Sequence, residues 1–278
     1  DTSATLTLTT DGTDTLTGTY TVGPNEDSTD LTVTKAEAVG TVEDTAGNSF
    51  FGLLPAGTNL GDTSDVVVDT AAPTVVSITP DVTTLNSASA PAVLTIVLGE
   101  DSTDFEATDL TDSSAGTFAN LTGTGSNYTV EFTPGINFEN TTTITVSNGA
   151  FTDLAGNAYA TDGTSASIDV DTLAPTITGI ASPVSLAKFG TAIVTFTVSE
   201  STTNFSDLDL VTTGGTLTGF TGAGTTYTAT FTPTDDVNSG TGLISIAGGV
   251  LTDSAGNPNL ASSVTILYDT QAPTVTIT

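Results

Sequence analysis

Residues 69–74 read Asp-Thr-Ala-Ala-Pro-Thr, and the same pattern, Asp-Thr-x-Ala-Pro-Thr, returns at 171–176 and 269–274. A second motif, Asp-x-Ala-Gly-Asn, occurs shortly before each copy of the first. Its three occurrences are residues 44–48, 153–157 and 253–257. Two motifs that recur in step, at intervals of about 100 residues, indicate an array of similar domains.

The motif copies also set the predicted domain boundaries. We expect domains at residues 1–69, 70–170 and 171–270, followed by an extra segment at 271–278. Only a few residues, one of them a conformationally restricted proline, separate the last strand of one domain from the first strand of the next. Junctions this short favour a rod-like array over domains on a flexible string.

Alternation of apolar and polar residues identifies β-strands in both complete repeats. The clearest apolar faces are Leu94, Ile96 and Leu98 in one repeat and Val194, Phe196 and Val198 in the next. No segment shows a helical period, and Gly, Asn, Asp and Pro turns separate the short strands. The sequence therefore predicts an all-β protein made of tandem immunoglobulin-like Greek-key β-sandwich domains in an elongated array.

The charge of the chain is one-sided. It carries 32 acidic residues against Lys35 and Lys188, for a formal net charge of -30. Nucleic acid and acidic membranes are disfavoured partners, because their phosphates would find few cations here. No apolar run approaches the roughly 20 residues that cross a bilayer, so we expect no direct membrane insertion. Metal cations are the obvious counter-charge, although a solvated acidic surface suffices to explain most of the carboxylates.

The sequence offers few of the groups that enzymes use. It has no His and no Cys, so the usual base-activated nucleophiles lack their parts. A glycosidase pair of carboxylates is compatible with the residue types alone. The acidic positions recur from repeat to repeat, however, whereas an active site is usually built once. We therefore expect a non-enzymatic protein.

The combination of Asp-Thr-x-Ala-Pro-Thr at domain starts, a Thr-rich strand with Tyr, and Asp-x-Ala-Gly-Asn near domain ends resembles the bacterial immunoglobulin-like repeats of giant surface adhesins and biofilm matrix proteins. The resemblance covers nearly the whole chain. It implies an extracellular or cell-surface stalk whose partners are neighbouring Ig-like repeats, with structural calcium in or between domains. The first domain departs from the pattern, because its leading strand or strands are missing and its segment 48–69 is longer.

Calcium prefers about six to eight hard oxygen ligands. The two complete repeats align so that their acidic positions coincide, and the resemblance implies that these positions lie near one end of each sandwich. The predicted ligands are Glu100, Asp109 and Asp153 with Glu200, Asp209 and Asp253, assisted by Asn157 and Asn257, and Asp44 and Asn48 in the first domain. An interdomain ion is considered for the junction residues Asp69, Asp169, Asp171 and Asp269. The alternative for all of them is a plain turn, in which Asp and Asn bond their own backbone.

Residues 271–278 read as the opening strand of a further domain. Either the chain is cut from a longer array, or this segment completes the first domain of a neighbouring molecule by strand addition and builds a homopolymer. The leading hypothesis is a calcium-stabilised extracellular stalk or filament module. The alternative is a calcium-dependent glycan- or host-binding module, which an exposed aromatic side chain beside an acidic loop, absent from the other repeats, would favour.

Overall fold

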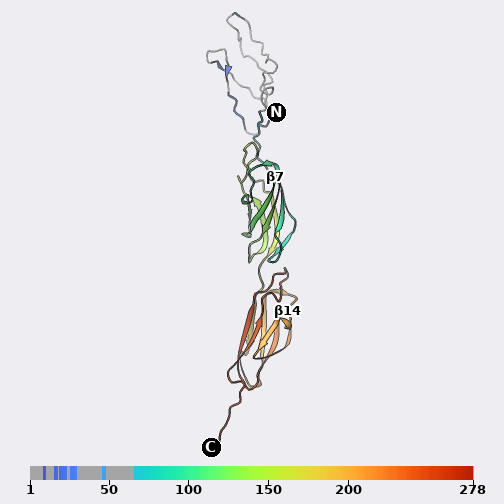
Figure 1. The fold of residues 1–278 in the computed structure, drawn as a ribbon, viewed down its shortest axis with the longest axis vertical. Coiled ribbons are helices and arrows are strands. Elements are labelled where there is room, and N and C mark those ends of the chain that lie inside the picture. Colours follow the sequence, from blue (N-terminus) through green and yellow to red (C-terminus); the bar gives the residue numbers. More distant parts are fainter. Residues whose placement is uncertain are drawn as a thin grey trace.

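The computed structural model describes the second and third domains and parts of the first. The described residues are 9–10, 16–17, 19–23, 26–29, 46–47 and 66–277. In the first domain, β1 (Thr9–Thr10) pairs antiparallel with β2 (Leu16–Thr17), and Ser28 forms an isolated bridge with Val68. The two complete domains follow one another along the long axis of the molecule (Figure 1).

The second domain is a sandwich of two sheets. One sheet has the order β3 (Val75–Pro80), β5 (Ala92–Ser102), β7 (Thr117–Thr133). The other has the order β4 (Thr84–Asn86), β9 (Ser165–Asp171), β8 (Glu139–Val146), β6 (Leu110–Asp112). A short 3-10 helix, η1 (Ala107–Asp109), leads from β5 into β6. Strands β3 to β8 alternate between the two sheets, and β9 then pairs with β8 in the same sheet.

The third domain repeats this topology strand for strand. Its sheets have the orders β10 (Ile177–Ser182), β12 (Ala192–Thr202), β14 (Gly215–Pro233) and β11 (Ser185–Ala187), β16 (Ser262–Asp269), β15 (Gly240–Ile246), β13 (Leu210–Thr213). The 3-10 helix η2 (Asp207–Asp209) takes the place of η1. The prediction of tandem immunoglobulin-like β-sandwiches is confirmed.

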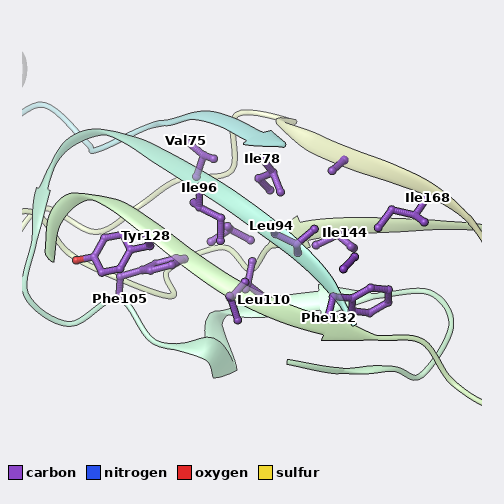
Figure 2. Packing of buried hydrophobic residues seen from close by; sticks show 14 of the residues in the cluster. Val75, Ile78, Leu94, Ile96, Phe105, Leu110, Tyr128, Phe132, Ile144 and Ile168 are labelled. Carbon is purple, nitrogen blue, oxygen red and sulfur yellow. The ribbon is translucent and has the colours of Figure 1, made fainter. Parts of the chain in front are cut away.

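Each sandwich has its own hydrophobic core, built from the alternating residues of its strands. Leu94, Ile96 and Leu98 are at most 2% exposed, and Figure 2 shows the first two packed between the sheets with Ile144 and Phe132. The third domain buries the equivalent set in a separate cluster. The two cores share no residue, so each domain is stabilised mainly by its own burial of apolar surface.

The conspicuous aromatic residues belong to these cores. The Phe105 and Tyr128 rings lie 4.9 Å apart, and the Phe205 and Tyr227 rings 5.0 Å apart. The Tyr128 hydroxyl donates a hydrogen bond of 2.9 Å to the backbone carbonyl of Ser102, and Figure 2 shows the ring inside the sandwich. These four aromatic residues are all buried and pack within the cores.

The segment after Asp269 has the sequence of a first strand but pairs with no strand among the described residues. Val275 follows Pro273 at the spacing at which buried Val75 follows Pro73 and begins β3. In this structure Val275 and Ile277 are 86% and 93% exposed. An apolar alternation that would be half-buried in a sandwich therefore faces solvent here.

Because the cores are separate, a cavity in one domain should leave the other intact. Phe196 is fully buried, and we expect Phe196→Ala to destabilise the third domain by about 3–5 kcal/mol. The matched change Thr197→Ala, on the exposed face of the same strand, should cost about 1 kcal/mol or less. Calorimetry should show one transition moving to lower temperature while the second-domain transition stays. A joint shift of all transitions would contradict the independence of the cores.

Candidate metal centre

The Asp-x-Ala-Gly-Asn motif of the second domain forms a tight loop closed around its aspartate. Asp153 Oδ1 accepts hydrogen bonds from the backbone N–H groups of Ala155, at 2.8 Å, and Asn157, at 2.9 Å. Gly156 adopts φ 91°, a left-handed conformation that favours glycine. The loop is thus the Asp-led turn that the sequence offered as one interpretation.

The third domain builds the same loop. Asp253 Oδ1 accepts from the N–H groups of Gly256, at 2.7 Å, and Asn257, at 2.9 Å, and Gly256 has φ 95°. Both aspartates are buried, with 5% and 6% of their surface exposed. Burial of an aspartate with several N–H donors keeps its carboxylate in a fixed position.

The asparagine that ends each motif reaches across the domain junction. Asn157 Nδ2 donates to Asp153 Oδ2 at 2.9 Å and to the backbone carbonyl of Asp69 at 3.0 Å. Asn257 Nδ2 donates likewise to Asp253 Oδ2 and to the carbonyl of Asp171, both at 2.9 Å. Each motif therefore holds the junction aspartate of the Asp-Thr-x-Ala-Pro segment against its own loop.

A glutamate completes each cluster. Carboxylate oxygens of Asp69, Glu100 and Asp153 lie within 4.8 Å of one another, and so do those of Asp171, Glu200 and Asp253. The two glutamates lie in β5 and β12 inside the register shifts that interrupt pairing with β7 and β14. Such irregularities re-aim side chains at the edge of a sheet. We call the two sets the Asp69 triad and the Asp171 triad.

Burial, together with the neighbouring carboxylates, raises the pKa of the central glutamates. Burial, and then the neighbouring Asp253 and Asp171 carboxylates, raise the pKa of Glu200 from 4.5 to about 7. Burial, Asp69 and Asp153 likewise raise the pKa of Glu100. Glu200 Oε1 is buried without a hydrogen-bond partner in the part of the chain that the structure describes. An acceptor of this kind is costly unless a cation or a donor reaches it.

Each triad has a further acidic neighbour that the sequence analysis missed. Glu139 in β8 lies opposite Asp171 in the register of β8 and β9, and its charge contributes to the raised pKa of Glu200. Asp27 stands beside the Asp69 triad, accepts a hydrogen bond of 2.9 Å from the Thr70 N–H, and acts on Glu100 in the same way. Only strand register brings these residues to the junction, and no local motif marks them.

Several predicted ligands have other positions. Asp109 Oδ2 accepts from the Glu106 N–H and Asp209 Oδ2 from the Ser206 N–H, each at 2.7 Å, so these aspartates cap η1 and η2. Asp169 is exposed on β9 and accepts a hydrogen bond of 2.6 Å from the Thr141 hydroxyl. None of the three belongs to a triad. Asp44 and Asn48 lie outside the described residues.

The spacing of the triad oxygens suits a calcium ion. Two oxygens bound to one calcium ion at 2.3–2.6 Å are at most about 5 Å apart, whereas magnesium at 2.0–2.1 Å allows only about 4 Å. Oxygens within 4.8 Å of one another can therefore ligate calcium with little movement. Water, the backbone and the fourth acid could supply the remaining ligands.

The fold and the two clusters define a tandem array of immunoglobulin-like sandwiches with acidic junctions. The bacterial Ig-like domain family matches residues 69–170 and 171–268, so the protein belongs to this family. A search of curated proteins finds no match. Among the described residues, no helix is long and apolar enough to cross a membrane.

Solved structures with this kind of fold include two bacterial adhesins. FdeC, an Escherichia coli adhesin, is 15% identical over 77% of this chain and 71% of its own, with a TM-score of 0.38. The Yersinia pseudotuberculosis adhesin InvE is 14% identical over 69% of this chain and 58% of its own, with a TM-score of 0.27. The I9-I11 tandem from titin is 10% identical over 72% of this chain and 66% of its own, with a TM-score of 0.34.

In the absence of divalent cations, removing the Glu200 charge should stabilise the third domain. Its raised pKa means that the folded chain binds a proton more tightly than the unfolded chain, so stability falls as the pH rises from about 4.5 through about 7. At pH 8 we expect Glu200→Gln to raise Tm by about 4 °C or more and to flatten this pH dependence.

The control for this measurement is Asp207→Asn, which removes an exposed charge from the same domain. Calorimetry in chelator across the pH range should show little change for the control. A Tm of the unmodified third domain that does not fall between pH 5 and pH 8 would contradict the raised pKa.

Proposed function

We propose that the protein is a non-enzymatic, calcium-stabilised extracellular stalk or filament module of the cell surface, of the kind that extends an adhesin or a matrix fibre. The observation that carries the proposal is the repetition of one acidic triad at both domain junctions, in the same position of the fold. A site that recurs with every repeat serves the array as a whole. It therefore favours a structural role over a catalytic one.

A cation at the triad would link residues that belong to two different domains. Asp171 ends the last strand of the second domain, whereas Glu200 and Asp253 belong to the third. One ion bound to all three would fix the junction at both of its sides. Since the ligands converge only in the folded chain, binding would stabilise the folded state and stiffen the rod.

The calcium proposal predicts a specific thermal response at the junction. We expect saturating calcium to stabilise the unmodified chain by about 3 kcal/mol at a hundredfold excess over Kd, while magnesium at matched ionic strength does less. Glu200→Gln should lose the response of the third domain without losing the fold, because the amide keeps the shape of the side chain. Asp253→Asn should lose it as well.

The matched control is Asp169→Asn, which removes an exposed acid near the junction that belongs to neither triad. It should respond to calcium like the unmodified chain. Equal stabilisation by calcium and magnesium, or a full calcium response in Glu200→Gln, would contradict a specific calcium site. Charge screening would then explain the stabilisation, and the loops would be ordinary turns.

The segment after Asp269, which is exposed over residues 271–277, supports a second part of the proposal, polymerisation by strand donation. Its apolar alternation matches the strands that open the complete domains and is unpaired among the described residues. Added to the first domain of a neighbouring molecule, it would build a head-to-tail filament.

Deletion of residues 271–278 tests strand donation directly. Electron microscopy of the full chain should show filaments that disappear in the deletion and in a variant carrying both Val275→Asp and Ile277→Asp. The monomer should keep its fold, because these side chains are 86% and 93% exposed. Filaments that persist in both variants would rule out this segment as the donor.

The alternative function, a calcium-dependent glycan-binding module, has one observation in its favour. Phe189 is an aromatic residue of the third domain that is 83% exposed, and Ala88 stands in its place in the second domain. A cavity of about 310 Å³ lined by Asp207, Leu210 and Phe220 also belongs to the third domain, but it includes no triad residue.

A further inference from the structure

One turn of the second domain hydrogen-bonds the third domain. The turn is residues 86–89, between β4 and β5. Asn86 Nδ2 donates a hydrogen bond of 2.7 Å to the carbonyl of Ala255, and the Ser87 N–H donates one of 2.7 Å to Asn257 Oδ1. The turn of one domain thus forms hydrogen bonds with the Asp-x-Ala-Gly-Asn loop of the next.

The third domain has a turn at the corresponding place, residues 187–190, although Phe189 has a positive φ that its counterpart Ala88 does not share. The Gly190 N–H donates to the Ala187 carbonyl at 2.9 Å, as the Ser89 N–H does to the Asn86 carbonyl at 3.2 Å. In the parallel pairing of β11 with β16, Ala187 lies opposite Asp269. In the second domain, Asn86 lies opposite Asp171 in the same way. The turn at 187–190 therefore adjoins a junction aspartate.

Asp269 has the local structure of the two triad aspartates at this position. Its Oδ1 accepts the N–H of Gln271 at 3.1 Å, as Asp69 accepts that of Ala71 at 3.0 Å and Asp171 that of Leu173 at 3.2 Å. It is thus oriented to begin a third acidic cluster. In such a cluster the other two carboxylates would be a strand glutamate and a motif aspartate of a docked Ig-like repeat.

The sequence of this second turn differs from the first at all four positions. Ala187 stands in the place of Asn86 and lacks its side-chain amide, and Gly190 stands in the place of Ser89. Lys188 replaces Ser87, and Phe189 replaces Ala88. The Lys188 ammonium lies 5.5 Å from the centre of the Phe189 ring, and it has no carboxylate within 4.0 Å among the described residues. Phe189 is 83% exposed and has φ 67°, a left-handed conformation unfavourable for a bulky side chain. A strained, solvated aromatic next to an unpaired cation is typical of a surface that meets a partner.

We propose that the turn at residues 187–190 is a docking surface for the Asp-x-Ala-Gly-Asn loop of a following Ig-like repeat, and that Lys188 supplies the counter-charge for the acidic cluster begun by Asp269. A junction built in this way holds its geometry without a divalent cation. The comparison with the calcium-dependent junctions rests on the proposed function. The docking itself rests on the hydrogen bond from the Ser87 N–H to Asn257 Oδ1, which the Lys188 N–H would repeat, because Ala187 cannot replace the Asn86 amide.

The reach of a lysine side chain fits this role. The Ser87 N–H bonds Asn257, whose amide in turn bonds Asp253 Oδ2 at 2.9 Å and Asp171 Oδ1 at 3.1 Å. A long side chain at this position could therefore reach the carboxylates of Asp253 and Asp171. A lysine there can extend its flexible four-carbon stem to them and offer three N–H donors to the crowded oxygens. Phe189 would then cover the ion pair from water.

An extended chain tests the docking. Residues 173–278 are appended after Thr270 of the full chain, which creates a new junction at Asp269. Spin labels at Thr195→Cys of the resident third domain and of the appended copy report the distance across that junction. A second pair of labels, at Thr95→Cys and Thr195→Cys, reports the distance across the junction between domains 70–170 and 171–270. The chain has no other cysteine that could react with the label.

We expect a narrow distance distribution across the new junction in chelator. Lys188→Gln should broaden it, calcium should narrow it again, and Lys188→Arg, which keeps the charge, should leave it narrow. A broad distribution in chelator for the unmodified turn, or a narrow one unaffected by Lys188→Gln, would overturn the proposal. Binding of the full chain to immobilised glycans that is lost in Phe189→Ala, with a new junction that stays broad, would overturn it in favour of glycan recognition.

The reciprocal variant uses the natural chain. We expect Ser87→Lys to remove the calcium requirement of the junction at Asp171, so that its distance distribution becomes narrow in chelator. If that junction is insensitive to calcium in the unmodified chain, the proposed calcium function fails. The Lys188 variants at the new junction would still decide the docking proposal.

Discussion

Repulsion between carboxylates is the constraint under which both junctions are built. Carboxylate oxygens that lie within 4.8 Å of one another repel when both groups are charged, and the repulsion is stronger than in bulk water because the effective dielectric constant near a protein is lower. Each triad contains three such pairs, and a fourth acid stands close by. The fold nevertheless holds these groups together, because each is fixed by a different segment. Asp171 ends β9, Glu200 lies in the irregular part of β12, and Asp253 is fixed within its own loop.

The turn and ligand interpretations of the Asp-x-Ala-Gly-Asn motif are compatible. Asp253 uses its oxygens to accept from the Gly256 and Asn257 backbone and from the Asn257 amide. These bonds orient the carboxylate but leave part of its acceptor capacity open, since each oxygen has two lone pairs. The turn chemistry thus pre-positions the group for a cation. A motif kept only as a turn would not require a glutamate from another strand beside it.

Much of the structure could be predicted from local sequence pattern. The strand alternation that places Leu94 and Ile96 inward, and the motif periodicity, depend on neighbouring residues in the chain and were readable directly. The meeting of Glu100 with Asp153 was also expected, because the resemblance to bacterial immunoglobulin-like repeats implies that both acids lie near one end of the sandwich. Asp109 was grouped with them for the same reason, but its recurrence reflects the capping of a 3-10 helix. Periodicity therefore identifies positions that matter in every repeat without distinguishing the physical reason.

The remaining parts of the junction depend on register and on contacts between domains. Glu139 reaches the Asp171 triad because β8 pairs with β9 in one particular register, and a shift by one residue would turn it to the other face. The hydrogen bonds from Asn86 and Ser87 to the next domain depend on how the two sandwiches are oriented, which no local sequence pattern encodes. Contacts between residues far apart in the chain therefore determine these parts of the junction, and local sequence does not.

The position of the triads also determines how the array would carry tension. A pull along the rod passes from β9 through the short segment after Asp171 into β10, which begins at Ile177. Without a further tie, the third domain is loaded through that one strand at the edge of its sheet. The Asn257 amide already links the Asp171 carbonyl to the loop at Asp253, and the proposed cation would add Glu200 of the central strand β12. With the proposed cation bound, load would enter the sheet through β10 and β12 together, and the acidic junction would reinforce the connection between the two domains.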